Sequence, residues 1–131
     1  MLKGYRSAPA MEYHFLDFRL LPGQVRLIKA GQDVALAPKT FHFLCLMLGA
    51  GNAVVSRDRL FEQLWQGRAV SDESLAQVVA QCRRALDDSA ARQRIIKTIP
   101  KLGYRLIPEI TVYYPDTVDA CWIMNGPVPG N

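Results

Sequence analysis

The sequence predicts a mixed α+β fold in which a small antiparallel sheet precedes three helices and a closing β-hairpin. Short apolar and aromatic runs separated by turn residues fill residues 13–36, a pattern typical of an antiparallel meander. Apolar residues then recur at helical spacing over residues 38–86. Residues 94–106 are β-prone on either side of a turn at 100–103, which indicates a hairpin.

The sheet is expected to contain four short strands, each rich in aromatic or β-branched residues. These strands are predicted at residues 13–16, 18–21, 25–29 and 34–36. Pro22 and Gly23 form one connecting turn, and residues 30–33 form the next, because proline, glycine and aspartate favour turns. Tight turns between consecutive strands predict an antiparallel order.

The first helix is expected to begin at Pro38, since proline is tolerated in a first helical turn, and to end at Gly49 and Gly51. Ser56 is a good N-cap for the second helix, with Asp58 in its first turn. The predicted buried stripe of the first helix is Phe41, Leu44, Cys45 and Leu48, and that of the second is Leu60, Phe61, Leu64 and Trp65.

The third helix is predicted over residues 71–86, with Ser71 as its N-cap and two acids in its first turn. Its apolar stripe is Leu75, Val79, Cys82 and Leu86. The hairpin that follows spans residues 95–106. We expect Gly103 to supply a positive φ at its turn, and Tyr104 to brace it against the third helix.

Positive charge is concentrated in one part of the chain. The net charge is +4 and the pI about 9.1, which favours an anionic partner only weakly. Between residues 83 and 105, however, seven basic residues face only two acids. The seven are Arg83, Arg84, Arg92, Arg94, Lys97, Lys101 and Arg105. A merely solvated charged surface would not need this local bias.

Several function classes find no support in the sequence. No secretory signal and no apolar run long enough to span a membrane is present. The three cysteines, Cys45, Cys82 and Cys121, are widely spaced, which predicts neither disulfides nor a zinc site and fits a reducing cytoplasm. Without a nucleophile motif, phosphate loop or paired carboxylates, we expect no enzyme activity, no cofactor and no metal.

Four segments, in this order and spacing, resemble the OmpR/PhoB-type winged helix-turn-helix domain, and more closely its ToxR/CadC-like branch. They are Leu36-Ala37-Pro38-Lys39-Thr40-Phe41, Val55-Ser56-Arg57-Asp58-Arg59-Leu60, Val70-Ser71-Asp72-Glu73-Ser74-Leu75 with Cys82-Arg83-Arg84-Ala85-Leu86, and Thr98-Ile99-Pro100-Lys101-Leu102-Gly103-Tyr104-Arg105-Leu106. The resemblance covers residues 13–106. It implies a cytoplasmic bacterial transcription regulator that binds double-stranded DNA, with helix 71–86 in the major groove and wing 95–106 on the backbone or minor groove.

Base reading is assigned to the exposed side of the third helix. Glutamine can pair with adenine and alanine can touch thymine methyls; the simpler alternative is that these residues are only soluble helix formers. The predicted base-reading residues are Ala76, Gln77, Ala80 and Gln81. The predicted backbone or minor-groove contacts are Ser74, Arg83, Arg84, Lys97, Thr98 and Lys101. For the cations among them the alternative is a helix-end or solubilising role.

The expected organisation is a flexible start (1–12), a winged helix-turn-helix domain (13–107) and a C-terminal tail (108–131). Residues 111–114 are β-prone, and the apolar remainder of the tail suggests a self-association or partner segment. From this sequence we expect neither a receiver domain before the winged helix nor a membrane span after it. The resemblance further implies a homodimer on DNA and contact of loop 66–70 with RNA polymerase. Two alternatives remain: a protein-interaction adaptor without strong DNA binding, or the N-terminal part of a membrane-anchored regulator.

Overall fold

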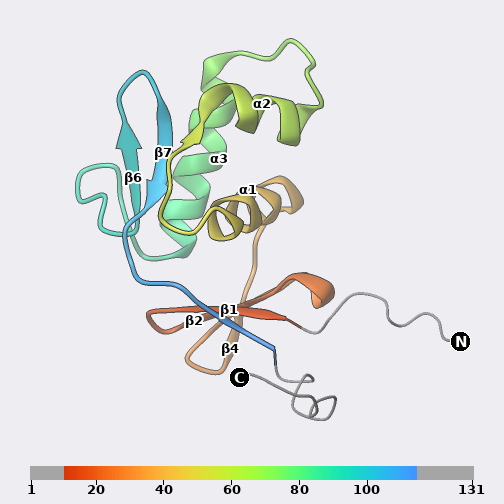
Figure 1. Ribbon diagram of the computed structural model, residues 1–131, viewed down its shortest axis with the longest axis vertical. Coiled ribbons are helices and arrows are strands. Elements are labelled where there is room, and N and C mark those ends of the chain that lie inside the picture. Colours follow the sequence, from red (N-terminus) through yellow and green to blue (C-terminus); the bar gives the residue numbers. More distant parts are fainter. Residues whose placement is uncertain (1–10, 115–131) are drawn as a thin grey trace, which may run out of the picture.

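The computed structural model, which describes residues 11–114, places a five-stranded sheet beneath three helices and a second, three-stranded sheet at their side (Figure 1). This is the predicted α+β class. The helices are α1 (Pro38–Gly49), α2 (Arg57–Trp65) and α3 (Asp72–Ala85). Within residues 11–114 no helix is both long and apolar enough to cross a membrane.

The first sheet has the strand order β4-β3-β2-β1-β8, with every neighbouring pair antiparallel. Its strands are β1 (Glu12–Phe15), β2 (Phe18–Leu21), β3 (Arg26–Lys29), β4 (Gln32–Val34) and β8 (Thr111–Tyr113). The turn between β3 and β4 is shorter than predicted, because Ala30 and Gly31 alone reverse the chain, both at positive φ. Strand β4 therefore begins at Gln32 and not at Val34.

Strand β8 corrects the prediction of a four-stranded sheet. It pairs with β1, with Val112 opposite Tyr13, although the two strands lie at opposite ends of the described chain. The chain leaves the wing, runs down past the helices and adds this fifth strand (Figure 1). Residues 111–113 thus belong to the folded domain. Residues 115–131 of the predicted tail, Cys121 included, lie outside the described residues, and the self-association role stays a prediction.

The core lies between the first sheet and the helices, and the predicted apolar stripes supply nearly half of its buried residues. Three residues of these stripes, Cys45, Phe61 and Trp65, are only partly buried. Leu75, Val79, Cys82 and Leu86 are all buried, as predicted for α3. On α1 the stripe is wider than predicted, because Phe43 and Met47 are also fully buried. This helix packs on α2, α3 and β7, so more than one of its sides is covered.

The second sheet has the order β5-β7-β6 and contains the predicted hairpin, here called the wing: β6 (Ile96–Ile99), its turn and β7 (Gly103–Leu106). Strand β5 (Val55–Ser56) pairs with β7. Gly103 does not have the positive φ that we predicted. A side chain there would collide with the Val55 carbonyl and lie 2.9 Å from the Ser56 Cα. Glycine is required because the β5 backbone approaches closely.

Candidate nucleic-acid interface

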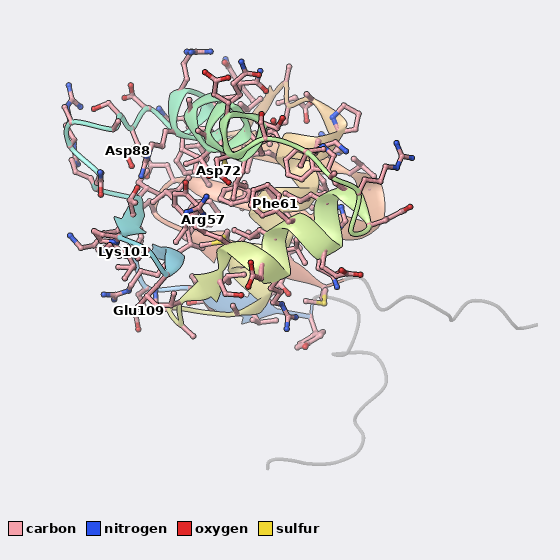
Figure 2. The ribbon with its side chains drawn as sticks, turned by 90° about the horizontal axis from the view of Figure 1, so that it is seen from above. Arg57, Phe61, Asp72, Asp88, Lys101 and Glu109 are labelled. Carbon is pink, nitrogen blue, oxygen red and sulfur yellow. The ribbon has the colours of Figure 1, made fainter. Side chains whose placement is uncertain are left out.

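Helix α3 begins beside α2, and an ion pair joins the two starts. Arg57 Nη2 lies 2.6 Å from Asp72 Oδ1, and Figure 2 shows the two side chains next to each other. Ser71 occupies the N-cap position with extended backbone, but its side chain caps no backbone N–H. Its hydroxyl lies 3.4 Å from that of Ser74 instead. The predicted N-cap is therefore correct in position but not in its hydrogen bond.

The four predicted base-reading residues lie on the outer side of α3. Ala76, Gln77, Ala80 and Gln81 are all exposed, whereas Leu75, Val78, Val79 and Cys82 on the inner side are buried. Arg84 is exposed beyond them, at the C-terminal end. An uncharged outer face with small residues lets a helix approach the floor of the major groove, where hydrogen-bonding side chains distinguish bases.

Arg83 is placed differently from the other predicted DNA-contacting residues. Only 7% of it is exposed, and its guanidinium faces β6 of the wing. Nε and Nη2 donate to the Ile96 carbonyl at 3.2 and 2.9 Å, and Nη2 donates to the Thr98 hydroxyl at 2.8 Å. Burial lowers the pKa of this guanidinium. The phosphate contact predicted for Arg83 remains untested, and the burial of its side chain argues against it. The contacts that Arg83 makes instead connect α3 to the wing.

Asp88 holds the same stretch of the wing from the loop after α3. Its Oδ1 accepts from the Arg94 N–H at 2.9 Å, and its Oδ2 accepts from the N–H groups of Ile95 and Ile96 at 2.9 and 3.1 Å. Burial raises the pKa of the carboxyl, but these backbone donors outweigh burial and lower it overall. Because Arg83 binds the carbonyl of Ile96, both polar groups of this residue are held by buried charges. We call Arg83 and Asp88 the wing clamp.

The tip of the wing is a tight turn of four residues. The Leu102 N–H donates to the Ile99 carbonyl at 3.0 Å, with Pro100 second and Lys101 third in the turn, at φ 67°. This is the pattern of a type II turn, whose third residue is usually glycine. Lys101 is exposed at the outer edge of the wing (Figure 2). The Leu102 carbonyl accepts from the Arg57 N–H at 3.0 Å, which links the tip to the start of α2.

The wing also carries two cations that face each other across its strands. Lys97 on β6 is paired directly with Arg105 on β7. Like charges opposite each other destabilise a hairpin unless an anion offsets them. Arg105 was not among the predicted site residues. The turn predicted at residues 100–103 did not give this pairing, because the observed register pairs Ile99 with Gly103 and therefore Lys97 with Arg105.

The remaining predicted residues are partly or fully exposed. Lys97 is exposed, Ser74 is half-buried, and Thr98 is half-buried with its hydroxyl accepting from Arg83.

The ring of Tyr104 meets Phe43 of α1 edge-on, with ring centroids 6.2 Å apart. Burial raises the pKa of the Cys82 thiol to about 12 and that of Cys45 to about 11. Cys82 is therefore an inert core residue, as predicted.

Comparisons with known proteins agree with this geometry. Residues 31–106 match the family "Transcriptional regulatory protein, C terminal". The chain is 35% identical over 79 residues to the cholera toxin transcriptional activator of Vibrio cholerae, covering 59% of this chain and 27% of that protein. It is 30% identical over 104 residues to the transcriptional regulator HilA of Salmonella typhimurium, covering 79% and 18%. The chain thus spans less than a third of the length of these relatives.

Solved structures show the same fold. The DNA-binding domain of Escherichia coli CadC matches with a TM-score of 0.68 at 23% identity, over 81% of this chain and all of that one. The Klebsiella pneumoniae RstA DNA-binding domain, solved with its RstA box, matches with a TM-score of 0.66 at 24% identity, over 72% and 95%. The Thermotoga maritima response regulator DrrB, an OmpR/PhoB homologue, matches at 0.67 and 29% identity, over 72% and 43%.

Proposed function

Because this chain belongs to the family of transcriptional regulatory protein C-terminal domains, we propose that it regulates transcription by binding specific sequences in double-stranded DNA. The observation that carries the proposal is the combination of an exposed outer face on α3, uncharged from Ala76 to Gln81, with a cationic wing beside it. Helix α3 lies in the major groove and the wing lies against the flanking backbone or minor groove.

Selectivity comes from the outer face of α3. Gln77 and Gln81 are one helical turn apart, so both reach base edges when the helix enters the groove. Ala76 and Ala80 lie beside them and allow close approach or contact thymine methyl groups. With no arginine on this part of the face, the preferred sequence depends on the two glutamines and on the shape of the groove.

Affinity comes from the cations around that face. Arg84 at the end of α3, together with Lys97, Lys101 and Arg105 of the wing, supplies charge for phosphates or for a narrow minor groove. Ser74 and Thr98, the two uncharged residues among the predicted backbone or minor-groove contacts, lie near these cations. A DNA phosphate bound between Lys97 and Arg105 offsets the repulsion between the two cations. Phosphate binding therefore explains why like charges are paired across the wing.

Partners beyond DNA follow from the family resemblance and from the relatives. We expect paired half-sites bound by a homodimer, and contact of loop 66–70 with RNA polymerase. The relatives are named as transcriptional activators or regulators, so activation of a promoter is the expected outcome. Since bacterial DNA lies in the cytoplasm, the DNA-binding segment acts there.

Selection from a randomised duplex library tests the function. The full chain should enrich one motif, and the affinity for that motif should fall steeply between about 50 and 200 mM salt, as counterion release requires. A non-enriched duplex of equal length is the control. Failure to enrich any motif at low salt, with the protein folded by circular dichroism, would instead favour a protein-binding adaptor.

A further inference from the structure

Gln81 differs from Gln77 in having a fixed partner inside the molecule. The hydroxyl of Thr40, in the first turn of α1, donates to Gln81 Oε1 at 3.0 Å. Thr40 is only 1% exposed, so its hydroxyl is shielded from water and depends on a protein acceptor. Gln81 itself is exposed on the outer face of α3.

This hydrogen bond orients the side-chain amide. With Oε1 held beside Thr40, Nε2 is the part of the amide that is free of this contact, and it offers donors only. Beside the pair lies an open hollow of about 300 Å³, lined by Ala35, Leu36, Ala37, Thr40, Gln81, Arg84 and Ala85. The guanidinium of Arg84 likewise carries hydrogen-bond donors and no acceptor atom. Gln81 and Arg84, the polar side chains at the C-terminal end of the outer face of α3, therefore present hydrogen-bond donors toward a ligand.

A donor-only glutamine reads bases differently from a free one. A free glutamine pairs with adenine by accepting from N6 and donating to N7, whereas guanine offers acceptors at both O6 and N7. The bond to Thr40 takes one of the two lone pairs of Oε1 and fixes this oxygen beside α1, which disfavours the contact that adenine N6 needs. We propose that Thr40 is a positioning residue that turns Gln81 into a reader of guanine. The inference rests on the proposed function and names the base that one residue selects.

The base selected by four proteins in the same library tests this inference. They are the wild type, Thr40→Val, Thr40→Ser and Gln81→Ala. Valine keeps the shape of threonine without the hydroxyl, and serine keeps the hydroxyl as the matched control. Gln81→Ala identifies the base pair that depends on this residue. At that pair the wild type and Thr40→Ser should favour guanine over adenine by about tenfold, and Thr40→Val should reduce the ratio to about twofold or reverse it.

Three results would overturn the proposal: a wild-type preference for adenine at that pair, an unchanged preference in Thr40→Val, or a preference in Thr40→Ser that follows the valine variant. A measurement without DNA separates this inference from the function itself. Relaxation of the Gln81 side-chain amide in nuclear magnetic resonance should show an ordered group in the wild type and a mobile one in Thr40→Val. Equal mobility in both proteins refutes the positioning role, whatever the library shows. An ordered amide in a protein that enriches no motif refutes the proposed function and with it the reading of guanine, and leaves only the Thr40 contact standing.

Discussion

The outer and inner sides of α3 use their side chains in opposite ways. On the outer side, Ala76, Gln77 and Ala80 are exposed. On the inner side, Arg83 is buried and, with Asp88, holds Ile96 at the base of the wing. The first region is available to read DNA, whereas the second fixes where the wing stands relative to the reading helix. Substitutions in the first region should therefore change which DNA is bound, and substitutions in the second should change stability and the position of the wing.

Asp88→Ala is expected to have the largest effect on stability. It removes the acceptor of three backbone N–H groups, two of them in buried hydrogen bonds, so the free energy of unfolding should fall by about 3 kcal/mol. Urea denaturation measures this loss. Asp87→Asn is the control, because Asp87 is the exposed neighbour and asparagine tolerates its φ of 62°, and it should change the free energy by less than about 0.5 kcal/mol. Similar losses in the two variants would show that the clamp carries no special stability.

The contribution of Asp88 should also depend on pH. Its pKa is lower in the folded protein than the ordinary value of 3.8, so its stabilisation is complete above that value and disappears as the pH falls through the folded pKa. The difference in unfolding free energy between the wild type and Asp88→Asn should be constant from about pH 5 to 8 and shrink below about pH 4. A difference that grew on acidification would contradict this sign.

Arg83→Met should be the next most destabilising change. Methionine keeps much of the apolar stem but leaves the Ile96 carbonyl and the Thr98 hydroxyl without their donor, at a cost of about 2 kcal/mol. Thermal unfolding monitored by circular dichroism measures it. Arg84→Met is the control on the exposed side and should leave stability nearly unchanged while weakening DNA binding. The reverse pattern would show that Arg83, and not Arg84, faces the DNA.

Gln77→Ala should leave stability unchanged, because the residue is exposed and alanine is a good helix former. It should cost about 1–3 kcal/mol of binding free energy at one base pair of the preferred motif and nothing at the others. Competition binding with single-base variants of the motif measures the effect. A uniform loss over all variants would mean that Gln77 contacts the backbone.

Lys101→Gly is expected to have the smallest effect. Glycine suits the positive φ of this turn position, so the wing should keep or slightly gain stability while losing one cation. The slope of log affinity against log salt should become less steep by about 1. An alanine variant would confuse the two effects, because alanine is strained at this φ. An unchanged slope would exclude a phosphate contact at the wing tip.

Much of the fold followed from local patterns in the sequence. Apolar spacing identified the three helices and nearly half of the buried core, and turn residues identified the strands and the wing. The β-prone character of residues 111–114 was recognised, but the pairing of β8 with β1 could not be foreseen, because a three-residue exposed segment carries no sign of a partner about a hundred residues earlier. Gly103 was misinterpreted for a similar reason: its requirement comes from β5, a strand distant in sequence.

The sequence predicted the site residues whose role depends only on lying on the exposed side of a helix. It did not predict which of two adjacent arginines contacts the wing and which faces solvent. The outer face of α3 follows from helical periodicity, and the structure places all four of its residues on the surface. Arg83 and Arg84 are adjacent and identical, so composition cannot tell which is buried. Only the position of the wing makes one of them a brace.

The division between the outer and inner sides of α3 is tested most directly by selecting the DNA motifs of Gln77→Ala and Arg83→Met at a temperature where both are folded. Gln77→Ala should lose preference at a base pair in the motif centre and keep its dependence on the flanks. Arg83→Met should keep the central preference that α3 reads and lose the flanking preference that the wing supplies. An unaltered central preference in Gln77→Ala, or a lost one in Arg83→Met, would contradict the separation of reading from positioning.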